Sequence, residues 1–272
     1  MSLLEETKRI LRRHRIFPKK RLGQHFTVFN PLFQRLAECA TLTSNDIVLD
    51  VGAGLGFLTR FLASKCRKVL AVEVDPRLVK VLLENLKNLS NVEVVEGDVL
   101  KTPISQFNKV VSIPPYNISS DLLLWLYERE FACAVLVFQK EFVNRIVAPV
   151  GSENYGWLTV LAYYQFEIEL FGDVPRWMFY PQPKVDSIIV RLNPKSTPPF
   201  PLENKAFFKQ LVQALFTQRN RKVRNAIKPF LDKYSKTVGS SVPPVDSLPF
   251  HDRRVRDLAP EDFGELSNVL LS

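Results

Sequence analysis

The chain has 272 residues, of which 46% are hydrophobic, and this suffices for one large domain and a smaller second one. Lysine and arginine total 37 against 28 aspartate and glutamate residues, so the net charge of +9 favours a polyanionic partner such as nucleic acid. No apolar run approaches the length of a membrane span, and we expect no membrane association. The N-terminus lacks the apolar core of a secretory signal, so a cytoplasmic location is expected.

The cysteines and histidines predict neither a metal site nor a disulfide framework. They are scattered, and they form neither a C-x-x-C pair nor the spacing of zinc ligands. The residues concerned are Cys39, Cys66, Cys133, His14, His25 and His251. We interpret the cysteines as free thiols in a reducing compartment.

The N-terminal stretch 1–20 is basic and mostly polar, and a few apolar residues give it the pattern of a loose amphipathic helix. Two interpretations are open. The stretch is either a solvated terminus that frays, or an arm that lies along the phosphates of a nucleic acid. The candidate phosphate contacts are Arg12, Arg13, Lys19 and Lys20.

The stretch from Ile47 to Phe57 reads Ile-Val-Leu-Asp-Val-Gly-Ala-Gly-Leu-Gly-Phe. Its apolar start is short enough for one strand buried on both faces. The glycines Gly52, Gly54 and Gly56 let the backbone turn sharply and approach a ligand. Apolar residues at helical spacing follow, so the stretch predicts a strand, a turn and a helix that bind a nucleotide-like ligand at the carboxyl end of a parallel sheet. The G-x-G-x-G spacing differs from the G-x-G-x-x-G of dinucleotide enzymes, which argues against an oxidoreductase.

Strands and helices alternate from this point, which predicts an α/β fold with a mostly parallel, Rossmann-like sheet. The expected strands are 47–51, 69–74, 92–95, 109–113 and 133–138, and the expected helices are 57–65, 76–88, 119–129 and 157–165. An earlier helix is expected from about Asn30 to Ala40, with Asn30 as its cap and Pro31 in its first turn. Two further strands, 166–171 and 185–192, have too little chain between them for a helical crossover, so we expect an antiparallel pair at the sheet edge.

The end of the chain predicts a second, all-helical domain. Residues 193–201 contain four prolines and read as a stiff linker. The segment after it is helix-patterned and carries a cluster of basic residues, Arg219, Arg221, Lys222 and Arg224. Such a cluster is commonly a solvated helix face, but positive charge concentrated at both ends of the chain favours RNA contact.

Two carboxylates follow the glycine turn at the ends of predicted strands. Glu73 ends the second strand, 17 positions after Gly56, where a carboxylate can accept from both hydroxyls of a ribose. Asp98 follows the third strand, and its carboxylate can accept from an exocyclic amine. Either residue alone could simply be a strand-end carboxylate facing water; together with the glycine turn they indicate a nucleoside site.

The stretch Ser112-Ile-Pro-Pro-Tyr-Asn-Ile-Ser119 follows the fourth strand. Pro114 and Pro115 stiffen the loop and remove two N–H donors, which leaves carbonyl oxygens and the ring of Tyr116. This suits an adenine: carbonyls accept from its N6 amine, and the ring stacks on the base. A structural Pro-Pro turn is the alternative.

With these motifs, the sequence resembles the small-subunit ribosomal RNA adenine dimethyltransferases, which use S-adenosylmethionine. The resemblance spans nearly the whole chain, and the Phe179-Tyr-Pro-Gln-Pro-Lys-Val-Asp-Ser187 stretch with a helical tail distinguishes this family from generic methyltransferases. Further matching stretches are Lys20-Arg-Leu-Gly-Gln-His-Phe26, Asp50-Val-Gly-Ala-Gly-Leu-Gly56, Gly97-Asp98, Pro115-Tyr-Asn-Ile-Ser119, Gln218-Arg-Asn-Arg-Lys222 and Arg253-Arg-Val-Arg-Asp-Leu258.

The resemblance implies a role for each matching position. His25 and Thr27 would border the methionine part of the cofactor, Gly52 its carboxypropyl end, Glu73 the ribose and Asp98 the cofactor adenine. The full set of implied cofactor contacts is Gln24, His25, Thr27, Gly52, Gly54, Glu73, Val74, Asp98, Val99, Ser112 and Ile113. The implied catalytic residues, which hold the target adenine, are Ile113, Pro114, Pro115, Tyr116 and Phe179.

The resemblance also implies an organisation and a substrate. We expect a basic arm at 1–29, a methyltransferase domain at 30–192, a linker at 193–203 and an RNA-binding helical domain at 204–272. The expected activity is dimethylation of two adjacent adenosines near the 3′ end of small-subunit rRNA, by a monomer acting on the immature subunit.

One position departs from the family pattern. Where the family usually has Asn-Leu-Pro-Tyr or Asn-Ile-Pro-Tyr, this chain has Ile113-Pro-Pro-Tyr116. The asparagine that accepts from the target amine is missing, and the side chain of neighbouring Ser112 points the opposite way on a strand. Main-chain carbonyls could replace it, at a rate cost of about 10²-fold. We expect retained activity; the alternatives are a weak or inactive ribosome-assembly factor and, less favoured, a large-subunit rRNA adenine methyltransferase.

Overall fold

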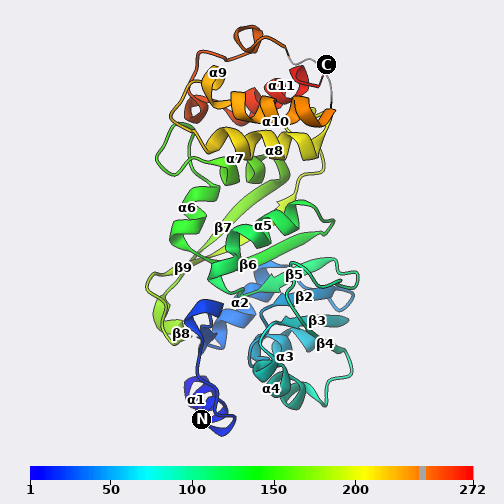
Figure 1. Ribbon diagram of the computed structural model, residues 1–272. Coiled ribbons are helices and arrows are strands. Elements are labelled where there is room, and N and C mark those ends of the chain that lie inside the picture. Colours follow the sequence, from blue (N-terminus) through cyan, green and yellow to red (C-terminus); the bar gives the residue numbers. More distant parts are fainter. Residues whose placement is uncertain (239–242, 272) are drawn as a thin grey trace. The chain divides into compact units, whose positions relative to one another are not determined.

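A seven-stranded sheet organises the first of two units into which the chain divides (Figure 1). The computed structural model describes residues 1–238 and 243–271. The strand order is β4-β3-β2-β5-β6-β9-β7, and β9 runs antiparallel to β6. The strands are β2 (Ile47–Val51), β3 (Lys68–Glu73), β4 (Val92–Glu96), β5 (Lys109–Ser112), β6 (Cys133–Gln139), β7 (Phe166–Val174) and β9 (Ser187–Pro194). All seven predicted strands are present, and the last two lie at one edge as expected.

Apolar runs rich in valine form the parallel part of the sheet, because strands covered on both faces need no polar side chain. Val48, Val69 and Val135 are fully buried in a core that they share with three helices. These helices are α2 (Pro31–Cys39), α3 (Phe57–Ala63) and α4 (Pro76–Leu86). The helix α5 (Ser119–Tyr127) connects β5 to β6, and a right-handed crossover places it on the other face.

The predicted helices exist, with ends that differ by a few residues. Pro31 begins α2 as expected, but Asn30 is itself helical and its side chain does not cap the helix. Asp75 caps α4 by accepting from the Arg77 N–H. A helix that the sequence did not predict, α6 (Lys140–Ile146), follows β6 directly.

The N-terminal stretch is an ordered helix rather than a frayed arm. Helix α1 (Leu3–Arg13) begins at a capping box in which the Ser2 side chain and backbone pair with Glu5. Its apolar side chains Leu3, Ile10 and Leu11 are buried in the same core as the sheet. A short pair, β1 (Phe26–Thr27) and β8 (Phe179–Tyr180), then joins the N-terminal segment to the stretch before β9. Residues 1–29 are therefore part of the first unit.

The second unit is helical and contains residues 144–166 together with the chain from Lys195 onward. Its helices are α7 (Trp157–Gln165), α8 (Lys205–Phe216), α9 (Val223–Ala226), α10 (Lys228–Val238) and α11 (Pro260–Val269). This differs from the expected boundary at 192, because α7 packs against α8 and α11 and so belongs with the tail. The proline-rich stretch 193–203 is also not a free linker: the Phe200 ring packs on Tyr164 and Phe208. Within the described ranges, no helix has the length and hydropathy to cross a membrane.

Candidate active site

The order of the parallel strands reverses between β2 and β5, and ligands of open α/β sheets bind outside the carboxyl ends of strands at such a point. Three adjoining cavities lie there, and Gly52 lines all three. The first also borders Asp50 and Thr27, the second Glu73 and Tyr116, and the third Asp98. All of the cofactor residues predicted from the sequence, except Ser112, therefore line these adjoining cavities.

The glycine turn is tied to the next strand and to the proline loop. The N–H groups of Gly52 and Ala53 both donate to the carbonyl of Val72, at 2.8 and 3.0 Å. Gly52 has a φ of +73°, and a Cβ there would lie 2.6 Å from Cδ of Pro115. A side chain at this position would be strained and would push the proline loop away. The turn after β2 and the loop after β5 therefore pack directly against each other.

Glu73 is held rigidly at the end of β3. Its side chain is buried, Oε2 accepts from the Gly54 N–H at 3.0 Å, and Oε1 accepts from the Asp75 N–H at 2.9 Å. Burial raises the pKa of this carboxyl above its ordinary value, although the hydrogen bonds oppose that shift. An anchored carboxylate facing the middle cavity suits the ribose contact that the resemblance implies.

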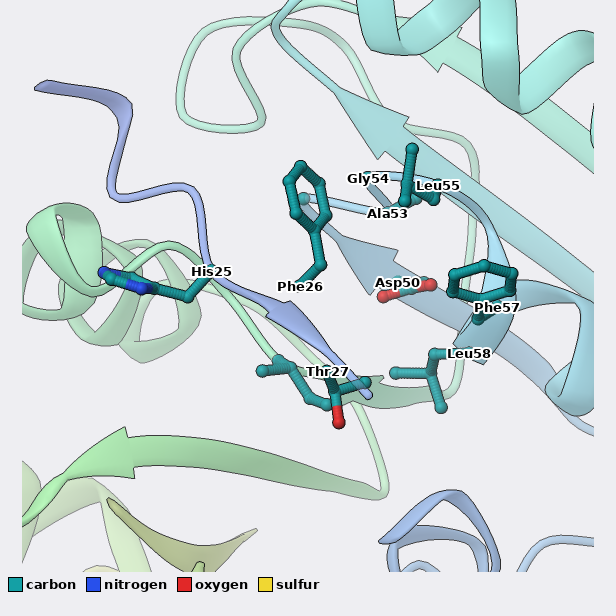
Figure 2. Close-up of a pocket in the computed structure, with 11 residues that line it drawn as sticks. His25, Phe26, Thr27, Asp50, Ala53, Gly54, Leu55, Phe57 and Leu58 are labelled. Atoms are coloured by element: carbon teal, nitrogen blue, oxygen red, sulfur yellow. The ribbon is translucent and has the colours of Figure 1, made fainter. Parts of the chain in front are cut away.

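Asp50 is a site residue that the prediction missed. It lines the first cavity beside Phe57 and Leu58 (Figure 2) and is almost completely buried. Its Oδ2 accepts from the Thr59 hydroxyl at 2.7 Å. Burial raises the pKa of Asp50 to about 7, and the negative charge of Glu73 adds to the shift. A single acidic residue inside an otherwise apolar strand was the available signal.

The third cavity is mostly apolar. Val74, Val99 and Ile118 line it, and Asp98 stands at its border. One carboxylate oxygen of Asp98 accepts from the Leu100 N–H at 3.0 Å, which fixes the side chain in the loop. A mostly apolar cavity with one carboxylate suits an adenine ring and its exocyclic amine. Leu22 and Ile118 are lining residues that the sequence prediction did not include.

The segment that follows α1 covers the middle cavity and is fastened to Asp75. The Gln24 amide donates to Asp75 Oδ2 at 3.0 Å and accepts from the Lys19 N–H at 2.8 Å. The Lys19 ammonium lies 3.6 Å from the same carboxylate, and Arg77 binds it through two nitrogens. The Arg77 guanidinium holds the pKa of Asp75 far below its usual range. Gln24 therefore lines the cavity while its amide holds the covering segment to Asp75, and the Lys19 ammonium forms an ion pair with the same carboxylate.

The proline loop places its aromatic residue against the stretch from Phe179 to Ser187, which leads into β9. The Tyr116 hydroxyl lies 2.8 Å from the Ser187 hydroxyl, and its ring meets Phe179 edge-on with centroids 6.4 Å apart. The His25 ring stands 5.7 Å from the Tyr116 ring, and its Nδ1 lies 2.6 Å from the Pro181 carbonyl oxygen. Figure 2 shows this ring pointing away from the Asp50 end of the first cavity. Ile113 borders the first and second cavities, and Pro114 borders the second.

Two predicted contacts, Ser112 and Phe179, need correction. The Ser112 side chain is fully buried and bonds to the N–H and carbonyl of Val51, so it does not reach the cleft. His25 borders the first cavity as predicted, but its ring contacts the Tyr116 side. Phe179 supports Tyr116 and is itself buried; it lines none of the three cavities described. The period-two side-chain alternation of a strand already placed Ser112 away from the cleft.

The predicted RNA contacts divide into exposed and internally paired side chains. Arg12, Arg13 and Lys20 of the first unit are exposed, as is Arg221 of the second. Lys222 and Arg224 both form ion pairs with Asp252, at 3.0 and 2.8 Å. The Arg219 guanidinium donates to the carbonyls of Ser152 and Glu153.

The two basic motifs of the tail interlock. Lys222 and Arg254 form an isolated antiparallel bridge, and the Val255 N–H donates to the Arg221 carbonyl. The Arg254 guanidinium donates to the Asn220 carbonyl, and that of Arg253 pairs with Asp262. Many of the basic side chains in these two motifs therefore bind carbonyls or carboxylates of the second unit and stabilise it.

The fold and the cleft define a Rossmann-like methyltransferase. The model of the family described as ribosomal RNA adenine dimethylase matches residues 17–243. A probable ribosomal RNA small subunit methyltransferase A from Methanosarcina acetivorans is 39% identical over 250 residues, which is 91% of each chain. One of the same name from Methanopyrus kandleri is 37% identical, over 94% of each chain.

Solved structures agree with this match. A dimethyladenosine transferase from Plasmodium falciparum has a TM-score of 0.74 and 30% identity, over 89% of this chain and 95% of its own. The 23S rRNA methyltransferase ErmE has a TM-score of 0.62 and 29% identity, over 91% of this chain and 100% of its own. The chain belongs to the ribosomal RNA adenine dimethylase family. It is an enzyme that uses S-adenosylmethionine to dimethylate adenine in ribosomal RNA.

Asp50 predicts a pH-dependent stability. The pKa of Asp50 is near 7 in the folded chain and about 3.9 in an unfolded one. The contribution of its protonated form to the free energy of unfolding is therefore complete below pH 4 and is lost as the pH rises through 7. Asp50→Asn cannot ionise. The free energy of unfolding of the variant minus that of the wild type should rise by on the order of 1.4 kcal/mol per pH unit between pH 5 and 7. Urea titrations of both proteins at several pH values measure it, and a constant difference would contradict the assignment.

Gln24 predicts a selective effect on cofactor affinity. Gln24→Ala removes both hydrogen bonds that fasten the covering segment, so S-adenosylmethionine should bind about tenfold more weakly. The matched control is Arg77→Ala, which also removes a partner of Asp75 but leaves the Gln24 bonds in place. Calorimetric titration of both variants measures the difference. Equal losses would mean that the side-chain partners of Asp75 in general, and not the covering segment in particular, determine affinity.

Proposed function

We propose that this enzyme dimethylates N6 of two adjacent adenosines near the 3′ end of small-subunit rRNA, as a cytoplasmic monomer that acts on the immature subunit. The observation that carries the proposal is the packing of the Pro115 ring against Gly52, which sets a loop suited to an adenine beside the cofactor cleft. The relatives at 36 to 39% identity named for the small subunit favour that substrate over the large subunit, whose methyltransferase ErmE is 29% identical.

The cleft fits S-adenosylmethionine in shape and in chemistry. Gly52 and Gly54 leave open the space beside the turn, Glu73 presents fixed acceptor oxygens, and the apolar slot at Asp98 suits a base. Asp50 and Glu73 bring two buried carboxyls to the cleft, which is favourable for a ligand that carries a cationic sulfur. The bound cofactor supplies an electrophilic methyl group.

The residues of the proline loop would orient the target base. The Tyr116 ring would stack on it, with its hydroxyl held by Ser187 and its edge by Phe179. Burial raises the pKa of Tyr116 to about 12, so the phenol stays neutral and keeps its hydrogen bond. The main-chain carbonyls at Ile113 and Pro114 would accept from the amine and direct its lone pair. Positioning in a site shielded from water would then provide most of the rate.

Tyr116 gives the first test of this proposal. Undermethylated small subunits are incubated with methyl-labelled S-adenosylmethionine, and the product nucleosides are identified. The wild type should form dimethyladenosine. Tyr116→Ala should lower the rate by about 10²-fold or more because the base loses its stacking surface and its position, while Tyr116→Phe keeps the ring and should lose less. Tight subunit binding by a wild type that transfers no methyl group would instead make it an assembly factor.

Ile113 gives a second test, because this position lacks the family asparagine. Ile113 borders both the first and second cavities, so a side-chain amide there would add an acceptor at the junction. Ile113→Asn should leave methyl transfer equal or faster in the same assay. A collapse of activity in a variant that still binds the cofactor would show that the loop depends on the apolar side chain.

Arg221 tests the contact with RNA. It is exposed, whereas Lys222 is paired with Asp252, so Arg221 is the cleaner position for charge reversal. Arg221→Glu should weaken subunit binding and reduce the slope of log affinity against log salt by about 1. Asn88→Glu on the exposed surface of the first unit adds a negative charge as a control. An unchanged slope in Arg221→Glu would show that the surface around Arg221 does not contact RNA phosphates.

A further inference from the structure

The second unit contains a groove that the methyl-transfer site does not use. It has a volume of about 600 Å³ and lies among α8, α9 and α10. Its lining residues are Gln210, Gln213, Ala214, Thr217, Gln218, Ala226, Pro229, Phe230, Lys233 and Tyr234. All of them belong to the second unit, so the groove is complete within it.

Two amide side chains of α8 line the groove. The face that packs into the core carries Phe208, Leu211 and Leu215, all fully buried. The face toward the groove carries Gln210 and Gln213, and Gln218 lines the groove just after the helix ends at Phe216. Each primary amide has both a donor and an acceptor group, so this face can satisfy the mixed pattern on the edge of a nucleobase.

The opposite wall is aromatic and fixed in place. The rings of Phe230 and Tyr234 are nearly parallel, with 5° between their planes and centroids 6.2 Å apart. Both rings meet Phe207 edge-on, at 5.4 and 5.0 Å, and Phe207 is itself buried. Flat rings anchored from behind offer a surface on which a base can stack.

The charge around the groove suits a polyanion. The segment from Asn204 to Tyr234 contains eight basic residues and a single acidic one, Asp232, so it carries +7 of the net +9 of the chain. No carboxylate is among the lining residues, and Lys233 is the charged one. A phosphate backbone would therefore meet attraction along the groove and no lining carboxylate.

The groove also holds an acceptor that has no donor. Gln218 Oε1 is buried and has no hydrogen-bond partner among the described residues. A buried acceptor without a partner costs free energy, and a ligand that brings an N–H group would remove that cost. The exocyclic amine or ring N–H of a base is such a donor.

We propose that this groove binds an unpaired nucleotide of the substrate RNA, with its base stacked on the Phe230 and Tyr234 rings and its edge on the glutamine amides. The inference rests on the proposed function and extends it, because it assigns to the second unit a contact with a base in addition to contacts with phosphates. Phosphate contacts alone provide affinity without distinguishing one site on an RNA from another. A base held in this groove would help to select where on the subunit the enzyme docks.

The test measures binding of the full-length protein to undermethylated small subunits and to protein-free small-subunit rRNA. Tyr234→Ala should weaken binding to both by roughly 5- to 100-fold, the range for losing one base–aromatic stack. Tyr234→Phe should stay within about twofold of the wild type, which separates stacking from folding. Gln213→Leu should also weaken binding, and Gln106→Leu at an exposed position of the first unit serves as its control.

The salt dependence shows which kind of contact was lost. Neither Tyr234→Ala nor Gln213→Leu removes a charge, so both should keep the wild-type slope of log affinity against log salt. Binding of both variants equal to that of the wild type, in a preparation that methylates normally, would overturn the groove assignment and leave the proposed function intact. A loss seen only with whole subunits would indicate a protein occupant and also overturn it. A wild-type protein that neither binds nor methylates small subunits would overturn both the groove assignment and the proposed function.

Discussion

The contact between Gly52 and Pro115 is the constraint on which the active site depends. Two loops that leave neighbouring strands of the sheet meet there with no room for a Cβ between them. One loop borders the cofactor cleft, and the other carries Tyr116. Because the sheet fixes both strand ends, the distance between the two binding sites is set by backbone packing and not by flexible side chains.

Most of the fold could be predicted from the sequence, because its signals are local. Apolar runs, glycine turns and strand–helix alternation are properties of short segments, and they located all seven strands of the main sheet. The boundary between the units could not be predicted in this way. Helix α7 follows the sheet strands in sequence, but its apolar face matches that of α8, and only the packing of distant segments reveals this. The short β1–β8 pair, which joins residues about 150 positions apart, escaped prediction for the same reason.

The site shows the same division between local and non-local information. The prediction placed Glu73, Asp98 and Tyr116 at the cleft because each lies at or just after the end of a strand in a recognisable motif. It missed Asp75, whose importance arises from partners far away in sequence, since Gln24 donates to it across 51 positions. It also assigned basic residues of the tail to RNA by charge alone. Charge does not reveal that Lys222 is paired with Asp252, because composition says nothing about which opposite charges meet after folding.

Asp50 and Glu73 connect stability to function. Both carboxyls are buried, and burial raises the pKa of each. In the protein without a ligand, the surroundings therefore disfavour the ionised form of both groups. Such an arrangement is unfavourable for folding alone, and a core built only for stability would contain apolar residues at these positions. It becomes favourable when a cationic ligand enters the cleft. In the proposed cofactor site, the free-energy cost of burying these carboxyls in the folded protein would be recovered when the cationic cofactor binds.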